Sequence, residues 1–222
     1  IYTLCLDPFT GKWLDRPRPL NLSNTLNISH LVRSSPQASV QGTVLALYRE
    51  TAHTLPLWVL LGNRGTTPVA AVWTAPQSRG LLQPTLSACP DGSWISLLRS
   101  ARPNQPRIFV SFCPPNGTWS PPRPTTLPNP NAGIDALLWS GSSLLVAYNP
   151  DASHRRRLAL ALLGTADGQL LTGPLLVDHS VHPNGEASYP TLLQGMGEAA
   201  HLFWTRDRKS IRHCRLSRMD AR

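Results

Sequence analysis

A unit of about fifty residues recurs along this chain, and few folds accommodate such a period. Turn-like segments that follow apolar stretches contain Gly11, Gly65, Gly117 and Gly168, which are separated by 54, 52 and 51 residues. Repeats of forty to fifty residues are typical of propellers, in which each repeat forms one small sheet called a blade. The repeat therefore predicts about four blades, with residues 1 to about 20 as the remnant of a further blade.

A second pattern has the same period: an apolar strand, a polar break and another apolar strand. The first strand of each pair is expected to end near one of four residues: Tyr48, Arg99, Tyr148 and Thr205. Both faces of a blade are buried, so Leu45 and Leu47 are expected to face one neighbouring blade, and Val44 and Ala46 the other. A β-sandwich with regular hairpins is the alternative, but the nearly equal period over four units favours the propeller.

Composition agrees with many short strands. The 22 prolines and 15 glycines are spread along the chain, and the 41% hydrophobic fraction is enough for a real core. The formal net charge is +9, and only two of the 21 basic residues, Lys12 and Lys209, are lysines. Guanidinium groups pair well with carboxylates and phosphates, although a GC-rich genome would produce the same excess of arginine. Charge alone does not identify the partner.

Other features restrict cofactor and compartment. The four cysteines, Cys5, Cys89, Cys113 and Cys214, are far apart and form no CxxC pair, so we expect buried thiols, with one disulfide as the alternative, and no metal or other cofactor. No run of eighteen apolar residues is present, so no membrane span is expected. The chain begins without Met, and its first residues are expected to lie in a strand. We therefore expect residues 1–222 to be one propeller domain that is N-terminally incomplete, with localisation and oligomeric state left open.

Several motifs in a fixed order resemble one family. The turn SFCPPNGTW, with Asn116, Gly117 and Trp119, resembles a degenerate Asp-box, a structural turn whose tryptophan packs between blades. Over nearly the whole chain, the order LVRSSP, GTVLALYRE, LLQPTL, LLRS, LPNPNAGIDAL, YNP, RRRLAL and SYPTLLQ resembles the BNR-repeat sialidase-like family. The resemblance implies an all-β fold, a β-propeller of the sialidase type. The family has six blades, of which this chain, as one sialidase-like propeller domain, would cover about four plus a partial one.

The resemblance also implies an anion pocket. Sialidases hold the carboxylate of sialic acid with three arginines from different blades, because guanidinium groups bind carboxylates bidentately. Arg99 in LLRS matches the second of these and Arg155 in RRRL the third, although a solvated hairpin tip would also explain Arg155. The first arginine and the aspartate general acid are expected in blades that precede Ile1.

Tyr189 in SYPTL stands where sialidases carry their nucleophile. A phenol with a pKa near 10 needs a base to accept its proton, and a buried structural tyrosine is the alternative. The family glutamate that serves as this base is replaced by Gln83, which we expect to contact substrate instead. Glu50 is the nearest substitute and the second expected catalytic residue. Of the other acidic candidates, Glu186 is expected at the surface and Asp135 in a strand-edge turn.

Amides in two loops are further candidates. Asn129 and Asn131 in PNPN, and Asn149 in YNP, carry side chains that can bond sugar hydroxyls, but Asn and Pro also form turns for local reasons. We expect Asn129 and Asn149 to contact the substrate.

The resemblance leads to one principal function and several alternatives. The principal expectation is an exo-acting glycosidase, most simply an exo-α-sialidase, whose partner is a glycan with a terminal acidic sugar. The first alternative is a non-catalytic glycan-binding propeller, which Gln83 favours. Another glycan-processing reaction on the same scaffold is also open. Nucleic-acid or polyanion binding is least favoured, because the basic residues are spread over many hairpins without interleaved aromatics.

Overall fold

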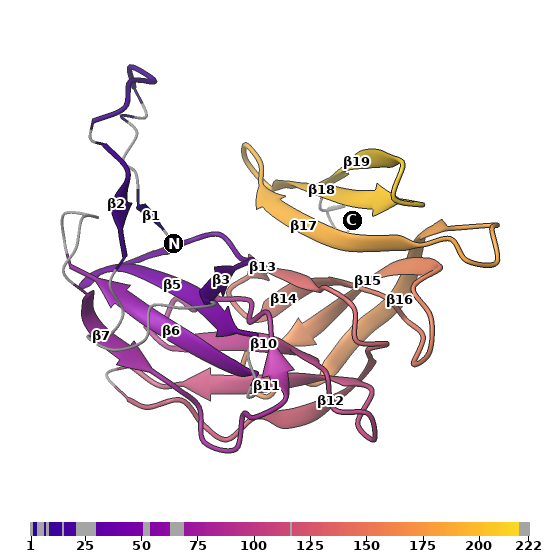
Figure 1. Ribbon diagram of the computed structural model, residues 1–222, viewed down its shortest axis with the longest axis horizontal. Helices are drawn as coiled ribbons and strands as arrows, with labels where there is room; N and C mark the ends of the chain where they lie inside the picture. The colour runs from indigo at the N-terminus through magenta and orange to yellow at the C-terminus, as the bar shows by residue number, and fades with distance from the viewer. Residues whose placement is uncertain are drawn as a thin grey trace.

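The computed structural model describes residues 2–3, 7, 9–14, 16–20, 30–50, 54–62, 69–115 and 117–217. Every regular element in these ranges is a β-strand (Figure 1). The strands are β1 (Tyr2–Thr3), β2 (Arg18–Pro19), β3 (His30–Val32), β4 (Gln37–Ser39), β5 (Gly42–Arg49), β6 (Leu55–Leu61), β7 (Val69–Trp73), β8 (Leu81–Leu82), β9 (Ser87–Ala88), β10 (Trp94–Ser100), β11 (Arg107–Cys113), β12 (Arg123–Pro128), β13 (Asp135–Ser140), β14 (Ser143–Tyr148), β15 (Arg157–Gly164), β16 (Leu170–His179), β17 (Ala187–Gln194), β18 (Ala199–Arg206) and β19 (Ser210–Ser217).

Four antiparallel sheets form the blades of a propeller (Figure 1). Blade 1 has the order β3–β5–β6–β7, with β4 also pairing with β5, and blade 2 has the order β8–β10–β11–β12, with β9 also pairing with β10. Blade 3 is β13–β14–β15–β16 and blade 4 is β17–β18–β19. The predicted all-β propeller of four blades is therefore confirmed. No helix in the described ranges is long and apolar enough to cross a membrane.

The second strands of the four blades end where the sequence pattern predicts. Tyr48 is one residue from the end of β5, Arg99 one residue from the end of β10, Tyr148 the last residue of β14 and Thr205 one residue from the end of β18. Each of these strands pairs antiparallel with the next strand along the chain, which forms the repeated hairpin.

Alternating side chains of blades 1, 2 and 3 pack into two different hydrophobic clusters, whereas those of blade 4 lie in one. Leu45 and Leu47 lie in a cluster with Leu20, whereas Val44 and Ala46 lie in another with Leu98 of blade 2. The alternation predicted for β5 is therefore confirmed. A fully buried side chain of this size contributes about 1.5–3 kcal/mol, so the interfaces between blades, more than any single sheet, hold the fold together.

The Asp-box turn works as predicted where the structure describes it. Trp119 is buried and stacks on Trp58 of blade 1, with ring centroids 3.9 Å apart and an interplanar angle of 15°. Asn116 and Gly65, which belong to the same predicted pattern, lie outside the described residues. Cys89, Cys113 and Cys214 are free thiols, and Cys5 also lies outside the described residues.

The N-terminal segment adds a small ribbon. β1 and β2 pair antiparallel through Tyr2 with Pro19 and Thr3 with Arg18. Leu20 then packs against β5 and β6 of blade 1. This ribbon stands where the sequence predicts the remnant of another blade.

Candidate active site at the hub

Matching turns in blades 2 and 4 bring two polar side chains to the hub. Gln83 in LLQPTL and Tyr189 in SYPTLL precede a proline, and both have a positive φ, 49° and 53° respectively. Non-glycine residues are uncommon in this left-handed region, and such residues cluster at functional sites. Tyr189 lies in the irregular stretch of β17 between Ser188 and Thr191, where the pairing with β18 shifts.

Three other parts of the chain hold the Tyr189 turn. Arg33, which follows β3, donates from Nη2 to the Pro190 carbonyl at 2.6 Å. The Leu192 amide donates to Asp135 Oδ2 of blade 3 at 2.8 Å. Asn149 Nδ2 donates to the Ala187 carbonyl at 2.8 Å. The turn is therefore fixed from blades 1 and 3, while the Tyr189 side chain itself remains 40% exposed.

Three arginines from three blades surround this tyrosine. The guanidinium carbons of Arg33 and Arg155 each lie 5.7 Å from the centroid of the Tyr189 ring. Arg99, near the end of β10, lies close enough to the Tyr189 side chain for that side chain to act on the pKa of Arg99. The sequence predicts Arg99 and Arg155 here but expects the remaining arginine before Ile1. The structure instead brings Arg33, in the LVRSSP segment, to the same place.

Arg99 is buried and held by two amide oxygens. Its Nη1 donates to Gln83 Oε1 at 2.9 Å, and its Nε donates to Asn131 Oδ1 at 2.8 Å. Burial is the main cause that lowers the pKa of Arg99, and the charge of Arg155 lowers it further. The Tyr189 and Glu50 side chains act to raise the pKa of Arg99, but they do not outweigh the effect of burial. Arg99 thus bonds two neutral amide oxygens, an arrangement that leaves its positive charge for an incoming anion.

Gln83 cannot act as a base in this setting. It is buried, its Oε1 accepts from Arg99, and its Nε2 donates to the Tyr48 hydroxyl at 3.3 Å. Its side chain supports Arg99 instead of reaching into open space. Glu50, directly after β5, is exposed and lies close enough to Arg99 to influence its pKa.

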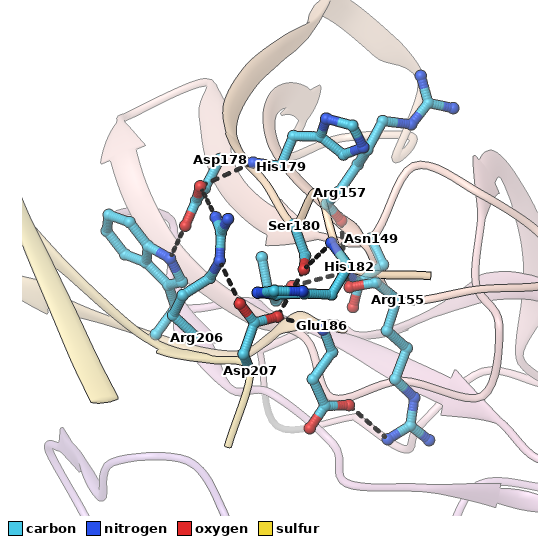
Figure 2. A network of polar contacts seen from close by, with 12 residues as sticks. Asn149, Arg155, Arg157, Asp178, His179, Ser180, His182, Glu186, Arg206 and Asp207 are labelled. Atoms are coloured by element: carbon cyan, nitrogen blue, oxygen red, sulfur yellow. Dashed lines mark hydrogen bonds and ion pairs between the residues drawn. The ribbon is translucent and has the colours of Figure 1, made fainter. Parts of the chain in front are cut away.

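Glu186 does not lie at the surface, contrary to the sequence expectation. It is 5% exposed, and its Oε1 accepts from Arg208 Nε at 2.7 Å while Oε2 lies 4.0 Å from Arg155 Nη1. Figure 2 shows this carboxylate reaching toward Arg155, with Asp207 and Ser180 near its backbone. The β18–β19 turn buries Glu186, because the Glu186 amide donates to Asp207 Oδ1 at 3.0 Å and the Asp207 amide donates to the Glu186 carbonyl at 2.7 Å.

The polar network in Figure 2 continues away from the hub. Ser180 Oγ donates to Asp207 Oδ1 at 2.5 Å, and this bond is the largest cause that lowers the pKa of Asp207 to about 2. Arg206 joins Asp207 to Asp178 by ion pairs. The network therefore ties blade 3 to blade 4 beside Arg155.

The asparagines divide into two groups. Asn129 and Asn149 are fully buried, so neither side chain is open to the solvent at the hub. The side-chain amide of Asn129 donates to the Ala132 carbonyl and accepts from the Ala132 backbone amide. Asn149 Nδ2 donates to backbone carbonyls of blade 3, at Arg155 and Arg157, and of blade 4, at Ala187. Their geometry corrects the expectation of direct sugar contacts and assigns both to loop structure. Asn131 is exposed and contacts the arginine cluster instead.

Asp135 is a buried carboxylate behind the turn rather than a strand-edge turn residue. Burial raises its pKa to about 6, while the amides of Leu192 and Ala136 and the charge of Arg33 pull in the other direction. It accepts from Ala136 N at 2.9 Å as well as from Leu192 N. Asp135 therefore contacts the Tyr189 strand and not the open side of the hub.

A large cavity lies elsewhere. It has a volume of about 650 Å³ and is lined by Trp94, Cys113 and Trp119 among other residues of blades 1 and 2. Trp94 and Arg99 lie at opposite ends of β10, so this cavity is at the other end of the blades from Tyr189. The charged and nucleophilic side chains gather instead around Tyr189. We call Tyr189 and the four arginines near it, Arg33, Arg99, Arg155 and Arg208, the hub cluster, and this cluster is the candidate active site.

Sequence reasoning missed two residues of this cluster, Arg33 and Arg208. LVRSSP occupies the first-strand position in blade 1 that LLQPTL has in blade 2, so the repeat itself is the signal that would have placed Arg33 at the hub. Ser34 Oγ also donates to the Pro84 carbonyl at 2.8 Å, which joins these two matching segments. Arg208 sits in a turn that local sequence does not mark as part of any site.

Comparison with known proteins agrees with this architecture. The BNR repeat-like domain family matches residues 8–202. No curated protein sequence is similar enough to be matched. Among solved structures, the NanB sialidase from Streptococcus pneumoniae in complex with 2-[(3-chlorobenzyl)ammonio]ethanesulfonate has a TM-score of 0.59 and 13% identity over 85% of this chain. The intramolecular trans-sialidase from Ruminococcus gnavus in complex with oseltamivir carboxylate has a TM-score of 0.59 and 14% identity over 82% of this chain.

This chain covers only part of those proteins. It spans 30% of the NanB chain and 42% of the trans-sialidase chain, and at such identities the likeness shows the fold. The family match, in contrast, includes most of the 222 residues. The chain therefore belongs to the BNR repeat-like domain family and has the fold of a sialidase-type propeller.

Proposed function

We propose that the hub cluster binds glycans that end in an acidic sugar, most simply sialic acid, and that the protein is an exo-acting glycoside hydrolase of the sialidase type. One observation carries the proposal: Arg33, Arg99 and Arg155 come from three blades and meet around Tyr189. Two structural neighbours are described in complex with a carboxylate and an ethanesulfonate, both acidic ligands, which supports an anionic ligand here.

The arginine cluster supplies recognition. A carboxylate on the anomeric carbon would accept charge-assisted hydrogen bonds from the guanidinium groups, which are the strongest donors for this planar anion. Gln83 and Asn131 hold Arg99 before the ligand arrives. Arg33 Nε is buried without a hydrogen-bond partner among the described residues, and this unsatisfied donor supports a ligand acceptor nearby.

Tyr189 supplies the nucleophile in this proposal. Its phenol oxygen attacks the anomeric carbon as the aglycone oxygen departs, and water later cleaves the glycosyl–tyrosine bond to release the sugar. Arg99, which lies close enough to Tyr189 for the two side chains to interact electrostatically, stabilises the developing phenolate by its positive charge. Glu50, exposed beside Arg99, accepts the phenol proton. The leaving oxygen also needs a proton donor, a role that we assign to none of the described residues.

Release of a fluorescent aglycone from an α-sialoside tests this proposal. Tyr189→Phe is expected to abolish turnover, and Glu50→Gln to lower it by roughly 10²–10⁴-fold, the usual contribution of a general base. Tyr2→Phe and Glu198→Gln are matched controls that change the same groups away from the hub. Full activity in Tyr189→Phe would overturn the assigned nucleophile.

A second candidate function is glycan binding without hydrolysis. The observation that favours it is Gln83, which replaces the family glutamate and is bonded at both ends of its amide. In this case the protein would bind an acidic sugar but release no aglycone. Turnover that appears only in Gln83→Glu would identify a binding site that has lost its base.

A further inference from the structure

The loop from residue 129 to residue 135 contacts the candidate site through several of its residues. Asn131, near its tip, lies between two arginines: its Oδ1 accepts from Arg99 Nε at 2.8 Å, and its backbone carbonyl accepts from Arg155 Nη2 at 2.6 Å. Gly133 packs so closely against the ring of Tyr189 that an added Cβ would lie 3.0 Å from Cδ1. One short loop therefore contacts three functional residues from three blades.

The base of this loop is rigid, so Asn131 has a defined place. Asn129 and Ala132 exchange two hydrogen bonds, at 2.9 and 3.1 Å, between the Asn129 amide group and the Ala132 backbone. The Asn129 backbone amide also donates to the Pro106 carbonyl at 2.8 Å, and Ala132 and Ile134 are fully buried. Side-chain bonds to nearby backbone of this kind fix a turn locally.

Asn131 itself has a left-handed backbone with φ of 51°. Apart from glycine, asparagine is among the residues that tolerate this region best. This conformation allows its side-chain oxygen and its carbonyl oxygen to face different arginines. A β-branched residue could not adopt it without strain, and an alanine would lose the side-chain acceptor.

The two arginines repel each other, and Asn131 offsets that repulsion without adding charge. Arg155 is a cause of the lowered pKa of Arg99, as expected for two guanidinium groups in one site. The side-chain and backbone oxygens of Asn131 are neutral, and each accepts one N–H from one of the two arginines. They keep the two guanidinium groups together and leave the net positive charge for a ligand.

We propose that Asn131 is a positioning residue that sets the separation and orientation of Arg99 and Arg155 so that both engage one carboxylate. This inference deepens the proposed function and rests on it for the identity of the ligand. The specificity that Asn131 provides is for the ionised carboxylate, not for the remainder of the sugar.

Binding of N-acetylneuraminic acid and of its methyl ester separates these contributions, because the ester replaces the negative charge by a methyl group and leaves the rest of the sugar unchanged. Asn131→Gly retains the left-handed backbone and the carbonyl that binds Arg155 but removes the acceptor for Arg99. We expect it to weaken binding of the acid by about tenfold, since a hydrogen bond to a charged group is lost, and to leave ester binding unchanged. Asn131→Asp should weaken acid binding at least as much, because its charge competes with the ligand carboxylate.

Asn104→Gly is the matched control, since Asn104 is exposed in the turn between β10 and β11 and takes part in neither of the two bonds to Asn131. It should bind both probes as the unmodified protein does. Equal weakening of acid and ester by Asn131→Gly would overturn the proposed specificity.

A measurement without ligand distinguishes failure of this inference from failure of the proposed function. The Nε–H of Arg99, assigned in nitrogen-labelled protein by its loss in Arg99→Lys, should exchange slowly with water and become fast in Asn131→Gly. If the unmodified protein binds neither probe but this change occurs, the sialic acid ligand is wrong and the positioning role stands. If the Arg99 signal is the same in both proteins, the positioning role is refuted whatever the ligand.

Discussion

Replacing Asp135 by asparagine should change how stability depends on pH. The buried carboxyl has its pKa raised to about 6 from an ordinary value of 3.8, mainly by burial. A raised pKa means that the folded protein holds the proton more tightly than the unfolded chain does. The contribution of Asp135 to stability is therefore full below about pH 4 and is lost as the pH rises through about 6.

The magnitude follows from the size of this shift. About two pH units at 1.36 kcal/mol each correspond to about 3 kcal/mol of unfolding free energy lost between pH 4 and pH 7. The amide introduced by Asp135→Asn cannot ionise, so the variant avoids this loss, although one of the two N–H groups that donate to Asp135 would lose its acceptor at every pH. The unfolding free energy of Asp135→Asn minus the unfolding free energy of the unmodified protein should thus rise by about 3 kcal/mol from pH 4 to pH 7.

Urea unfolding followed by tryptophan fluorescence at closely spaced pH values measures this difference. Asp151→Asn is a control for sign, because Arg157 lowers the pKa of Asp151, so its stabilisation disappears as the pH falls. The difference for Asp151→Asn should move in the opposite direction to that for Asp135→Asn, and chiefly below about pH 4, because the pKa of Asp151 is lowered from 3.8. A difference for Asp135→Asn that is flat, or that falls as the pH rises, would refute the argument from burial.

Two further predictions concern packing and the polar network. Trp119→Ala should lower the unfolding free energy by about 3–5 kcal/mol in urea denaturation, since it removes a buried ring that stacks on Trp58, whereas Trp13→Ala, at a site 65% exposed, should change it by less than about 0.5 kcal/mol. Equal effects of the two would contradict the assigned interface. Glu186→Gln should lower the unfolding free energy by about 1–3 kcal/mol at pH 7, because it removes a buried carboxylate that pairs with Arg155 and Arg208. An unchanged midpoint of thermal or urea unfolding would show that these two ion pairs do not stabilise the fold.

Much of the fold could be predicted because its determinants are local and repeated. The alternation of Val44, Leu45, Ala46 and Leu47 already indicates a strand buried on both faces, and the structure divides these side chains between two clusters as expected. The tryptophan of the Asp-box turn likewise packs between blades. Within the site, motif positions led to Tyr189 and Arg99, and the structure places them close enough for Tyr189 to act on the pKa of Arg99.

The remainder depends on contacts that local sequence does not contain. Arg33 bonds the carbonyl of Pro190, 157 residues away, and this contact exists only because blades 1 and 4 both reach the hub. Glu186 is buried by the turn around Asp207, 21 residues later, so its own neighbours along the chain give no sign of burial. Asn129 has the amide of a sugar-binding residue, but its bonds to Ala132 consume that amide in the turn.

Titration calorimetry of Arg99→Ala with N-acetylneuraminic acid and with its methyl ester is the most direct test of whether the hub holds a pocket that recognises a carboxylate. We expect the unmodified protein to prefer the acid. Arg99→Ala should weaken acid binding by roughly ten- to a hundredfold and leave ester binding unchanged, and the exposed-arginine control Arg107→Ala should bind both probes as the unmodified protein does. Equal binding of acid and ester by the unmodified protein, or an equal loss in Arg107→Ala, would contradict the presence of such a pocket.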